Sequence, residues 1–208
     1  MRSQLLATAA ALVVTASAMT GCSQSSQENA IPDAATSLTP TDPPPASFSP
    51  LATAPLNFRT LAGKGFQIQV PASWQDNVVP ATTTGGVPGV AAREPGRDPA
   101  RPIGVAVVID NDPSSDAVAQ SEVLATTKSS LGQAKDVKRS MVKWPDTQYA
   151  VLVSWTETPQ GTSDAYRVEQ LFAQVSPKLI VNVVGKAPVA DFATSGIERI
   201  MRTLVIKT

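Results

Sequence analysis

The sequence contains no histidine and a single cysteine, and aromatic residues make up only 5% of its 208 residues. Without histidine the chain cannot build a Ser–His–Asp or Cys–His nucleophile or an imidazole metal site. One cysteine can form neither an internal disulfide nor a thiolate zinc site. The 17 basic and 17 acidic side chains balance, so the excess of Lys and Arg that a broad nucleic-acid surface needs is missing. We therefore expect no metal, no cofactor and no nucleic-acid partner.

Residues 1–21 have the organisation of a bacterial export signal peptide. Arg2 supplies a positive charge, an apolar stretch follows over 5–18, and small residues crowd the end. Threonine and serine dilute the stretch, and it is shorter than the roughly 20 apolar residues that a membrane-spanning helix needs. We expect this segment to direct export and then to be removed.

The signal ends in Met19-Thr20-Gly21-Cys22, which resembles the lipobox of bacterial lipoproteins, with methionine in place of the usual leucine. The resemblance implies cleavage between Gly21 and Cys22, a diacylglyceryl group on the Cys22 sulfur, and an acyl chain such as palmitate on the new amino terminus. Two or three acyl chains hold a protein stably on a membrane, whereas one binds only marginally. The alternative is an ordinary secretory signal with a chance cysteine. The resemblance predicts an extracytoplasmic protein anchored to the cell membrane through Cys22.

Residues 22–55 are rich in Ser, Thr and Pro, include Pro43-Pro44-Pro45, and show no apolar periodicity. This composition is typical of a disordered, extended linker that holds a domain away from a surface. Threonines near prolines, at positions 36, 39, 41 and 53, suit O-glycosylation as well as they suit a bare linker. The remaining residues, 56–208, are enough for a single globular domain.

Within 56–208, strands are predicted where apolar residues alternate or run together between turn-forming residues. They cover residues 66–70, 90–92, 103–109, 137–142, 148–156, 166–175 and 178–186. A helix capped by Ser114 or Ser115 runs to about Leu131, with Ala117, Leu124 and Leu131 on one side, and Gly132 ends it.

A final helix is predicted over 189–203, with Phe192, Ile197, Ile200 and Met201 forming one apolar stripe. Gly196 lies inside this helix. Because glycine costs about 1 kcal/mol relative to alanine there, we expect it to allow a close contact with the sheet.

The order strands, helix, strands, helix predicts an α+β fold, since strands joined by short hairpins pair antiparallel and two one-sided helices must cover a sheet. The lipobox, the Ser/Thr/Pro linker, a strand ending in Val70-Pro71 before Trp74, and the closing meander and helix resemble the LpqN/LpqT type of mycobacterial and actinobacterial cell-envelope lipoprotein. This resemblance implies a PsbP-like fold, an antiparallel β-sheet packed with two main helices. It also implies a noncatalytic envelope protein associated with envelope glycolipids or with other proteins, and it supplies no catalytic residue.

Two local patterns could carry catalysis or metal binding. Ser140-Met141-Val142-Lys143 has the S-x-x-K spacing of acyl enzymes, but in a strand a three-residue offset points Ser140 and Lys143 to opposite faces. Asp110, Asn111, Asp112 and Asp116 could bind calcium, but the glycine and the distal glutamate of a twelve-residue calcium loop are missing. A turn followed by a helix start explains them better.

Two further patterns could bind ligands. The glycines Gly85, Gly86 and Gly89 could cradle phosphate, but no Gly-Lys-Ser/Thr follows, so a flexible turn is the better interpretation. Trp74, Trp144 and Trp155 could form a surface that contacts sugar or lipid. Large aromatics in a small domain more often pack in the core.

Two functions from different classes remain. The first is a lipid-anchored binding or accessory module for an envelope glycolipid or a partner protein, which needs no catalytic group. The second is a carboxylate-dependent glycan hydrolase, which needs two acidic side chains about 5 to 10 Å apart across a cleft. The acidic candidates are Glu94, Glu122, Glu157 and Glu169, all expected in solvated positions. We favour the binding module and predict no catalytic residue, with the ligand-binding residues left unassigned.

Overall fold

The computed structural model describes residues 39–45, 48–77, 89–98, 101–132, 134–159 and 162–207. The signal peptide, Gly21, Cys22, the linker up to residue 38, Gly85 and Gly86 lie outside these residues. The elements are, in chain order, β1 (Phe58–Gly63), β2 (Phe66–Pro71), β3 (Gln75–Asn77), β4 (Gly89–Arg93), β5 (Gly104–Asp110), α1 (Ala117–Ser130), β6 (Ala134–Val142), β7 (Tyr149–Glu157), β8 (Tyr166–Ser176), β9 (Leu179–Pro188), α2 (Val189–Phe192), α3 (Ile197–Met201) and β10 (Val205–Ile206).

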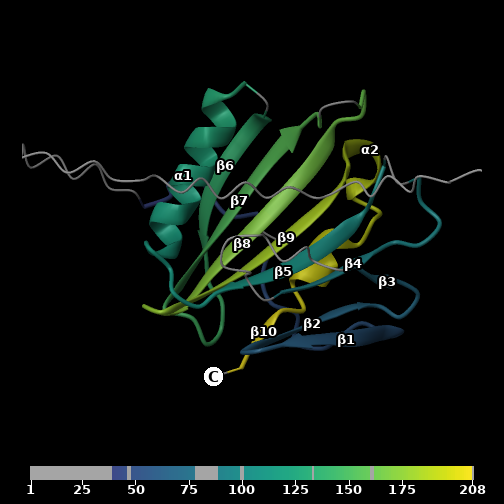
Figure 1. Cartoon of the computed structure of the whole chain (residues 1–208), viewed down its shortest axis with the longest axis horizontal. Helices are drawn as coiled ribbons and strands as arrows, with labels where there is room; N and C mark the ends of the chain where they lie inside the picture. The colour runs from purple at the N-terminus through teal and green to yellow at the C-terminus, as the bar shows by residue number, and fades with distance from the viewer. Residues whose placement is uncertain are drawn as a thin grey trace, which may run out of the picture.

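The strands form two antiparallel sheets (Figure 1). The large sheet has seven strands in the order β3-β4-β5-β9-β8-β7-β6, and the small sheet has three in the order β1-β2-β10. Hairpins join β6 to β7, β7 to β8 and β8 to β9, which is the predicted meander. The predicted α+β fold with an antiparallel sheet is confirmed.

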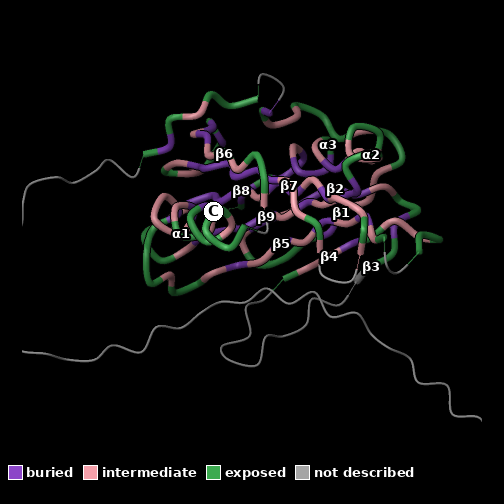
Figure 2. Tube along the Cα trace, turned by 90° about the horizontal axis from the view of Figure 1, so that it is seen from above, coloured by how far each residue is buried: buried purple, intermediate pink, exposed green. Residues whose placement is uncertain are grey.

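The large sheet is buried on both faces. On β7, Ala150 and Leu152 belong to one core cluster, whereas Val151, Val153 and Trp155 belong to the other. This alternation follows from the strand period of two, which sends successive side chains to opposite faces. The first cluster is shared with α3 and the small sheet, and the second with α1. Figure 2 shows the buried residues concentrated in the central strands.

Helix α1 packs on the sheet through small residues. Ala117, Ser121 and Ala125, one turn apart, are its buried positions, and they allow the helix to approach β6, β7 and β8 closely. The predicted stripe is wrong at its end, because Leu131 is 61% exposed beyond the helix. The predicted cap is also wrong, since the Asp116 carboxylate accepts the Ala119 N–H at 2.8 Å. Among the described residues, no helix is long and apolar enough to cross a membrane.

The prediction of one continuous final helix over 189–203 is wrong. The structure has two short helices, α2 and α3, because Gly196 between them adopts φ +74°, a left-handed conformation that favours glycine and ends a helix. A Cβ at Gly196 would meet nothing within 4 Å, so the expected close contact is absent there. The close contact lies on β9, where a Cβ on Gly185 would come within 2.4 Å of Ile197 Cγ2.

The packed part of the chain begins before residue 56. Phe48, which the sequence analysis assigned to the linker, is only 5% exposed, and its ring lies 5.8 Å from that of Trp144. The Leu51 N–H donates to the Arg202 carbonyl at 2.8 Å. The boundary at residue 56 is therefore too late, because one aromatic side chain in a Ser/Thr/Pro-rich stretch leaves no periodic signal.

The segment 39–45 covers the edge of the large sheet at β6. The Asp42 N–H donates to the Arg139 carbonyl at 3.2 Å, and the Ser140 hydroxyl donates to the Pro43 carbonyl at 3.1 Å. Pro43-Pro44-Pro45 then follows, and proline has no N–H to offer a further strand. The segment therefore shields part of an edge that would otherwise present unpaired backbone groups.

Candidate functional site

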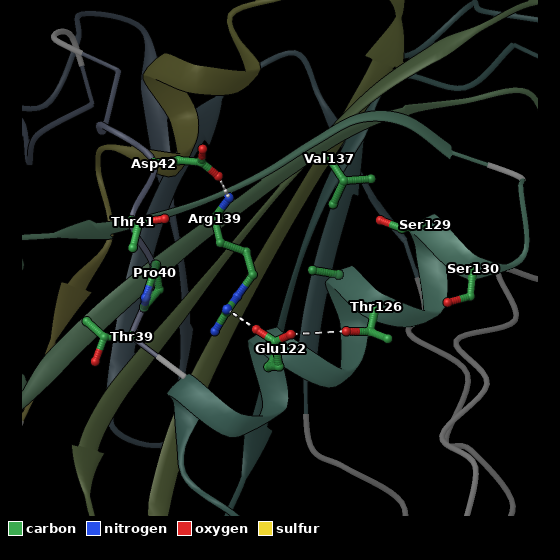
Figure 3. Close-up of a pocket in the computed structure, with 11 residues that line it drawn as sticks. Thr39, Pro40, Thr41, Asp42, Glu122, Thr126, Ser129, Ser130, Val137 and Arg139 are labelled. Carbon is green, nitrogen blue, oxygen red and sulfur yellow. Dashed lines mark hydrogen bonds and ion pairs between the residues drawn. The ribbon is translucent and has the colours of Figure 1, made fainter. Parts of the chain in front are cut away.

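A pocket of about 440 Å³ lies between the segment 39–42, helix α1 and strand β6 (Figure 3). Its size falls in the range of small-molecule sites. The lining residues are Thr39, Pro40, Thr41, Asp42, Glu122, Ala125, Thr126, Ser129, Ser130, Val137 and Arg139. The pocket is thus built from two stretches of chain, 39–42 and 122–139, that lie 80 to 100 positions apart in the sequence.

Arg139 on β6 contacts both the segment 39–42 and helix α1. Its guanidinium group donates to the Ser121 hydroxyl at 2.9 Å and to the Val118 carbonyl at 3.0 Å, and it forms an ion pair with Glu122. Its backbone N–H donates to Asp42 Oδ2 at 2.8 Å. Figure 3 shows the Arg139 side chain reaching from β6 to Glu122 on α1, with Asp42 at its backbone. One residue therefore joins the three parts of the pocket.

The lining chemistry suits a neutral, hydroxyl-rich ligand. Five side chains in the lining carry hydroxyl groups, and all five residues are exposed: Thr39, Thr41, Thr126, Ser129 and Ser130. Hydroxyl groups both donate and accept hydrogen bonds, and carboxylates accept them. The Arg139 charge is already met by Glu122, whose other oxygen accepts the Thr126 hydroxyl at 3.1 Å. The pocket is therefore polar without presenting an uncompensated cation for an anionic ligand.

A second, smaller pocket of about 310 Å³ lies on the α2–α3 side of the molecule. It is lined by Phe192, Ala193, Thr194, Gly196, Glu198, Arg199 and Arg202. Arg202 donates to the Ser49 carbonyl at 2.7 Å and lies 3.8 Å from Glu198. These contacts connect the segment around Ser49 to the end of α3. We therefore assign this second pocket a structural role.

The three tryptophans pack in the interior. Trp74, Trp144 and Trp155 are 6%, 6% and 3% exposed. The Trp144 indole N–H donates to the Leu204 carbonyl at 3.3 Å, and that of Trp155 donates to Glu157 Oε2 at 2.7 Å. The prediction that the tryptophans pack in the core is confirmed, and the alternative that they form a surface for sugar or lipid is wrong.

The four acidic candidates do not face one another in pairs. Each contacts a cation of its own: Glu94 with Arg97, Glu122 with Arg139, Glu157 with Lys128, and Glu169 with Arg167. A glycan hydrolase needs two carboxylates on either side of one bond. Four separate ion pairs on different elements provide no such arrangement.

Glu169, expected in a solvated position, is buried. It lies in the middle of β8, between Ser154 on β7 and Gly185 on β9, and is only 4% exposed. Arg167 lies 3.5 Å from Oε1, while the buried Oε2 has no hydrogen-bond partner. Burial raises the pKa of Glu169, Arg167 opposes this, and Glu198 adds to it. Its position could not be predicted from the sequence, because the nearby Arg167 and Gln170 are also polar and the stretch does not look buried.

The remaining sequence patterns have structural roles. Ser140 is 3% exposed and donates to Pro43, whereas Lys143 is exposed after the end of β6. Asp110 accepts the Gln120 amide at 3.1 Å and Asp116 caps α1, so the turn and helix-start interpretation is confirmed. Across the described parts of the chain, no three side chains of the types that bind metals cluster together. Gly89 begins β4.

No protein-family model and no curated protein matches this sequence. The fold, however, is known from solved structures. PsbP (CyanoP) of the cyanobacterium Synechocystis superposes with a TM-score of 0.51 at 12% identity, over 76% of this chain and 97% of that one. LpqN, a protein involved in cell envelope biogenesis of Mycobacterium tuberculosis, superposes with a TM-score of 0.51 at 11% identity, over 73% of this chain and 91% of that one. At such identities the likeness shows the fold alone, and it confirms the expected PsbP-like architecture.

Proposed function

We propose that this protein is a noncatalytic, lipid-anchored binding module of an actinobacterial cell envelope, and that the pocket beside α1 binds the sugar part of an envelope glycolipid. The observation that carries the proposal is the pocket lining, five hydroxyl groups and two carboxylates around a neutralised arginine. Sugars are recognised through hydrogen bonds to such groups.

The place of the pocket supports an envelope role. Its wall includes Thr39–Asp42, which follow Cys22 by 17 to 20 positions. An anchor on Cys22 would therefore hold the pocket near the membrane, where glycolipids are found. LpqN, which shares the fold, is involved in cell envelope biogenesis. In this proposal the protein lies outside the cytoplasm, and its second partner is a glycolipid or a protein that presents one.

The glycan hydrolase has no comparable support. Asp42 and Glu122 both line the pocket, but Asp42 accepts the Arg139 N–H and Glu122 is paired with the Arg139 guanidinium. Both carboxylates therefore hold the pocket together through one arginine. We propose that the pocket binds without catalysing a reaction.

The test is a titration with short-chain detergents of defined headgroup. Octyl glucoside and dodecyl maltoside, below their critical micelle concentrations, should shift the amide NMR signals of Thr126 and Ser130, whereas dodecyl phosphocholine should not. Thr126→Phe fills the pocket and should weaken binding of dodecyl maltoside at least tenfold. Thr60→Phe, at another exposed threonine on β1, is the matched control and should bind normally. Equal shifts with all three headgroups, or unchanged binding by Thr126→Phe, would contradict the proposal.

A further inference from the structure

The side of α1 that faces away from the sheet has few charges. The helix has only two charged side chains, Glu122 and Lys128. Glu122 is paired with Arg139 on β6, and Lys128 lies 2.5 Å from Glu157 and 5.1 Å from the Trp155 ring on β7. Both charges are therefore paired with groups on the sheet, although 38% of the Glu122 side chain and 24% of the Lys128 side chain stay exposed.

The outward residues are aliphatic or small and polar. Because Ala117, Ser121 and Ala125 face the sheet, a helical period of 3.6 places Val123, Thr126, Thr127 and Ser130 on the opposite side. Val123 is 66% exposed, and Leu131, which follows the helix, is 61% exposed. We call Val123, Thr126, Thr127, Ser130 and Leu131 the outer face of α1. These five residues are uncharged, and this lowers the desolvation cost of covering the face.

The chain itself indicates what covers this surface. Thr39 lines the pocket next to α1, on the same side as Thr126 and Ser130. It follows Cys22 by 17 positions, a span of at most about 60 Å when fully extended and about 23 Å for a flexible coil. An anchor on Cys22 would thus keep this end of the domain beside the bilayer at a high effective concentration, so that even a weak contact would be populated.

We propose that the outer face of α1 lies on the membrane to which Cys22 is anchored, so that the sugar pocket opens at the bilayer surface. This proposal rests on the lipid anchor of the proposed function. An uncharged face suits it, because no ion pair must be stripped of water when Val123 and Leu131 enter the interfacial region.

The test uses the mature protein, lipidated on Cys22 and reconstituted into vesicles of phosphatidylethanolamine and phosphatidylglycerol. Because lipidation blocks the Cys22 thiol, Thr127→Cys offers a single site for an environment-sensitive NBD label. We expect blue-shifted NBD emission and at least fivefold slower quenching by aqueous iodide than in detergent-free Cys22→Ala protein carrying the same label. A label at Thr60→Cys on β1 is the matched control and should be quenched equally in both forms.

The double change Val123→Asp and Leu131→Asp should restore fast quenching at position 127 while the protein still floats with the vesicles. If the Thr127 label is quenched rapidly in wild-type protein that floats, the docking proposal is overturned and the anchor stands. If the lipidation-competent protein does not float, the anchor itself is overturned. If the label is shielded in the Cys22→Ala protein in a concentration-dependent way, a second copy covers α1 and the membrane does not.

Discussion

At the scale of single residues, Glu169 is where charge and burial oppose each other most directly. Its carboxylate lies between two neighbouring strands with one oxygen unpartnered, and Arg167 reaches only the other oxygen at 3.5 Å. A buried charge without full hydrogen bonding lowers stability. Folding therefore raises the affinity of Glu169 for its proton, in agreement with its raised pKa.

This conflict predicts a pH dependence of stability. The folded pKa lies above the ordinary value of 4.5, so the folded state binds the proton more tightly than the unfolded state does. The contribution to stability is complete below pH 4.5 and is lost as the pH rises through the folded pKa. Glu169→Gln should therefore be more stable to urea than wild type at pH 7.5, with little difference between the two proteins at pH 4.

The matched control is Glu94→Gln, a half-exposed carboxylate paired with Arg97. It should change the free energy of unfolding little at either pH, since exposed ion pairs contribute little. Parallel pH profiles for wild type and Glu169→Gln would contradict our account of Glu169.

Gly185 is the residue that lets α3 approach the sheet. A Cβ there would lie 2.4 Å from Ile197 Cγ2 and 2.8 Å from Met201 Sδ. Gly185→Ala should therefore reduce the free energy of unfolding by about 1–3 kcal/mol through overpacking. Met201→Ala removes one of the two obstructing side chains, so the double variant should lose less than the sum of the single losses in urea unfolding. Additive losses would show that the two residues do not compete for space.

At the scale of elements, the segment before β1 belongs to the domain that it was expected only to connect. Phe48 packs against Trp144, and Asp42 pairs with the backbone of Arg139 on β6. This segment therefore closes the sheet edge and forms one wall of the pocket. Loss of the packing of this segment should destabilise both the sheet edge and the pocket wall.

Phe48→Ala tests this role. Truncating a buried phenylalanine should cost about 3 kcal/mol of unfolding free energy, measured by urea denaturation. Ser49→Ala is the control, because Ser49 contributes its backbone carbonyl to Arg202 and its side chain is exposed. A disordered linker over 22–55 predicts no effect of either change, so an unaltered midpoint for Phe48→Ala would restore that interpretation.

At the scale of the whole molecule, the proposed anchor and the folded domain are separable. Cys22→Ala removes the only cysteine without touching a described residue. We expect wild-type protein to remain in the membrane fraction through high-salt and carbonate washes, because two or more acyl chains give stable anchoring. The variant should appear in the soluble extracytoplasmic fraction with unchanged thermal stability. Membrane retention of Cys22→Ala would contradict lipid anchoring.

The sequence by itself determined the features that depend on neighbouring residues. The strand period of two in 148–156 and 166–175 predicted β7 and β8, and the turn before residue 117 predicted the start of α1 within two residues. The order of these elements was enough to predict the α+β class, since short hairpins force antiparallel pairing. Strands β1, β3 and β10 were missed, because β3 and β10 have only three and two residues and β1 buries only Leu61, so none shows apolar alternation.

Only the tertiary structure decided the features that join distant parts of the chain. The pocket exists because Asp42 meets Arg139, 97 positions away, and Glu169 is buried because its neighbours on β7 and β9 cover it. The final helix broke at Gly196, where glycine tolerates the left-handed conformation, and α3 then packs against Gly185 on β9. A local pattern reports the period of a strand or helix, but it carries no information about which distant surface will cover a given side chain.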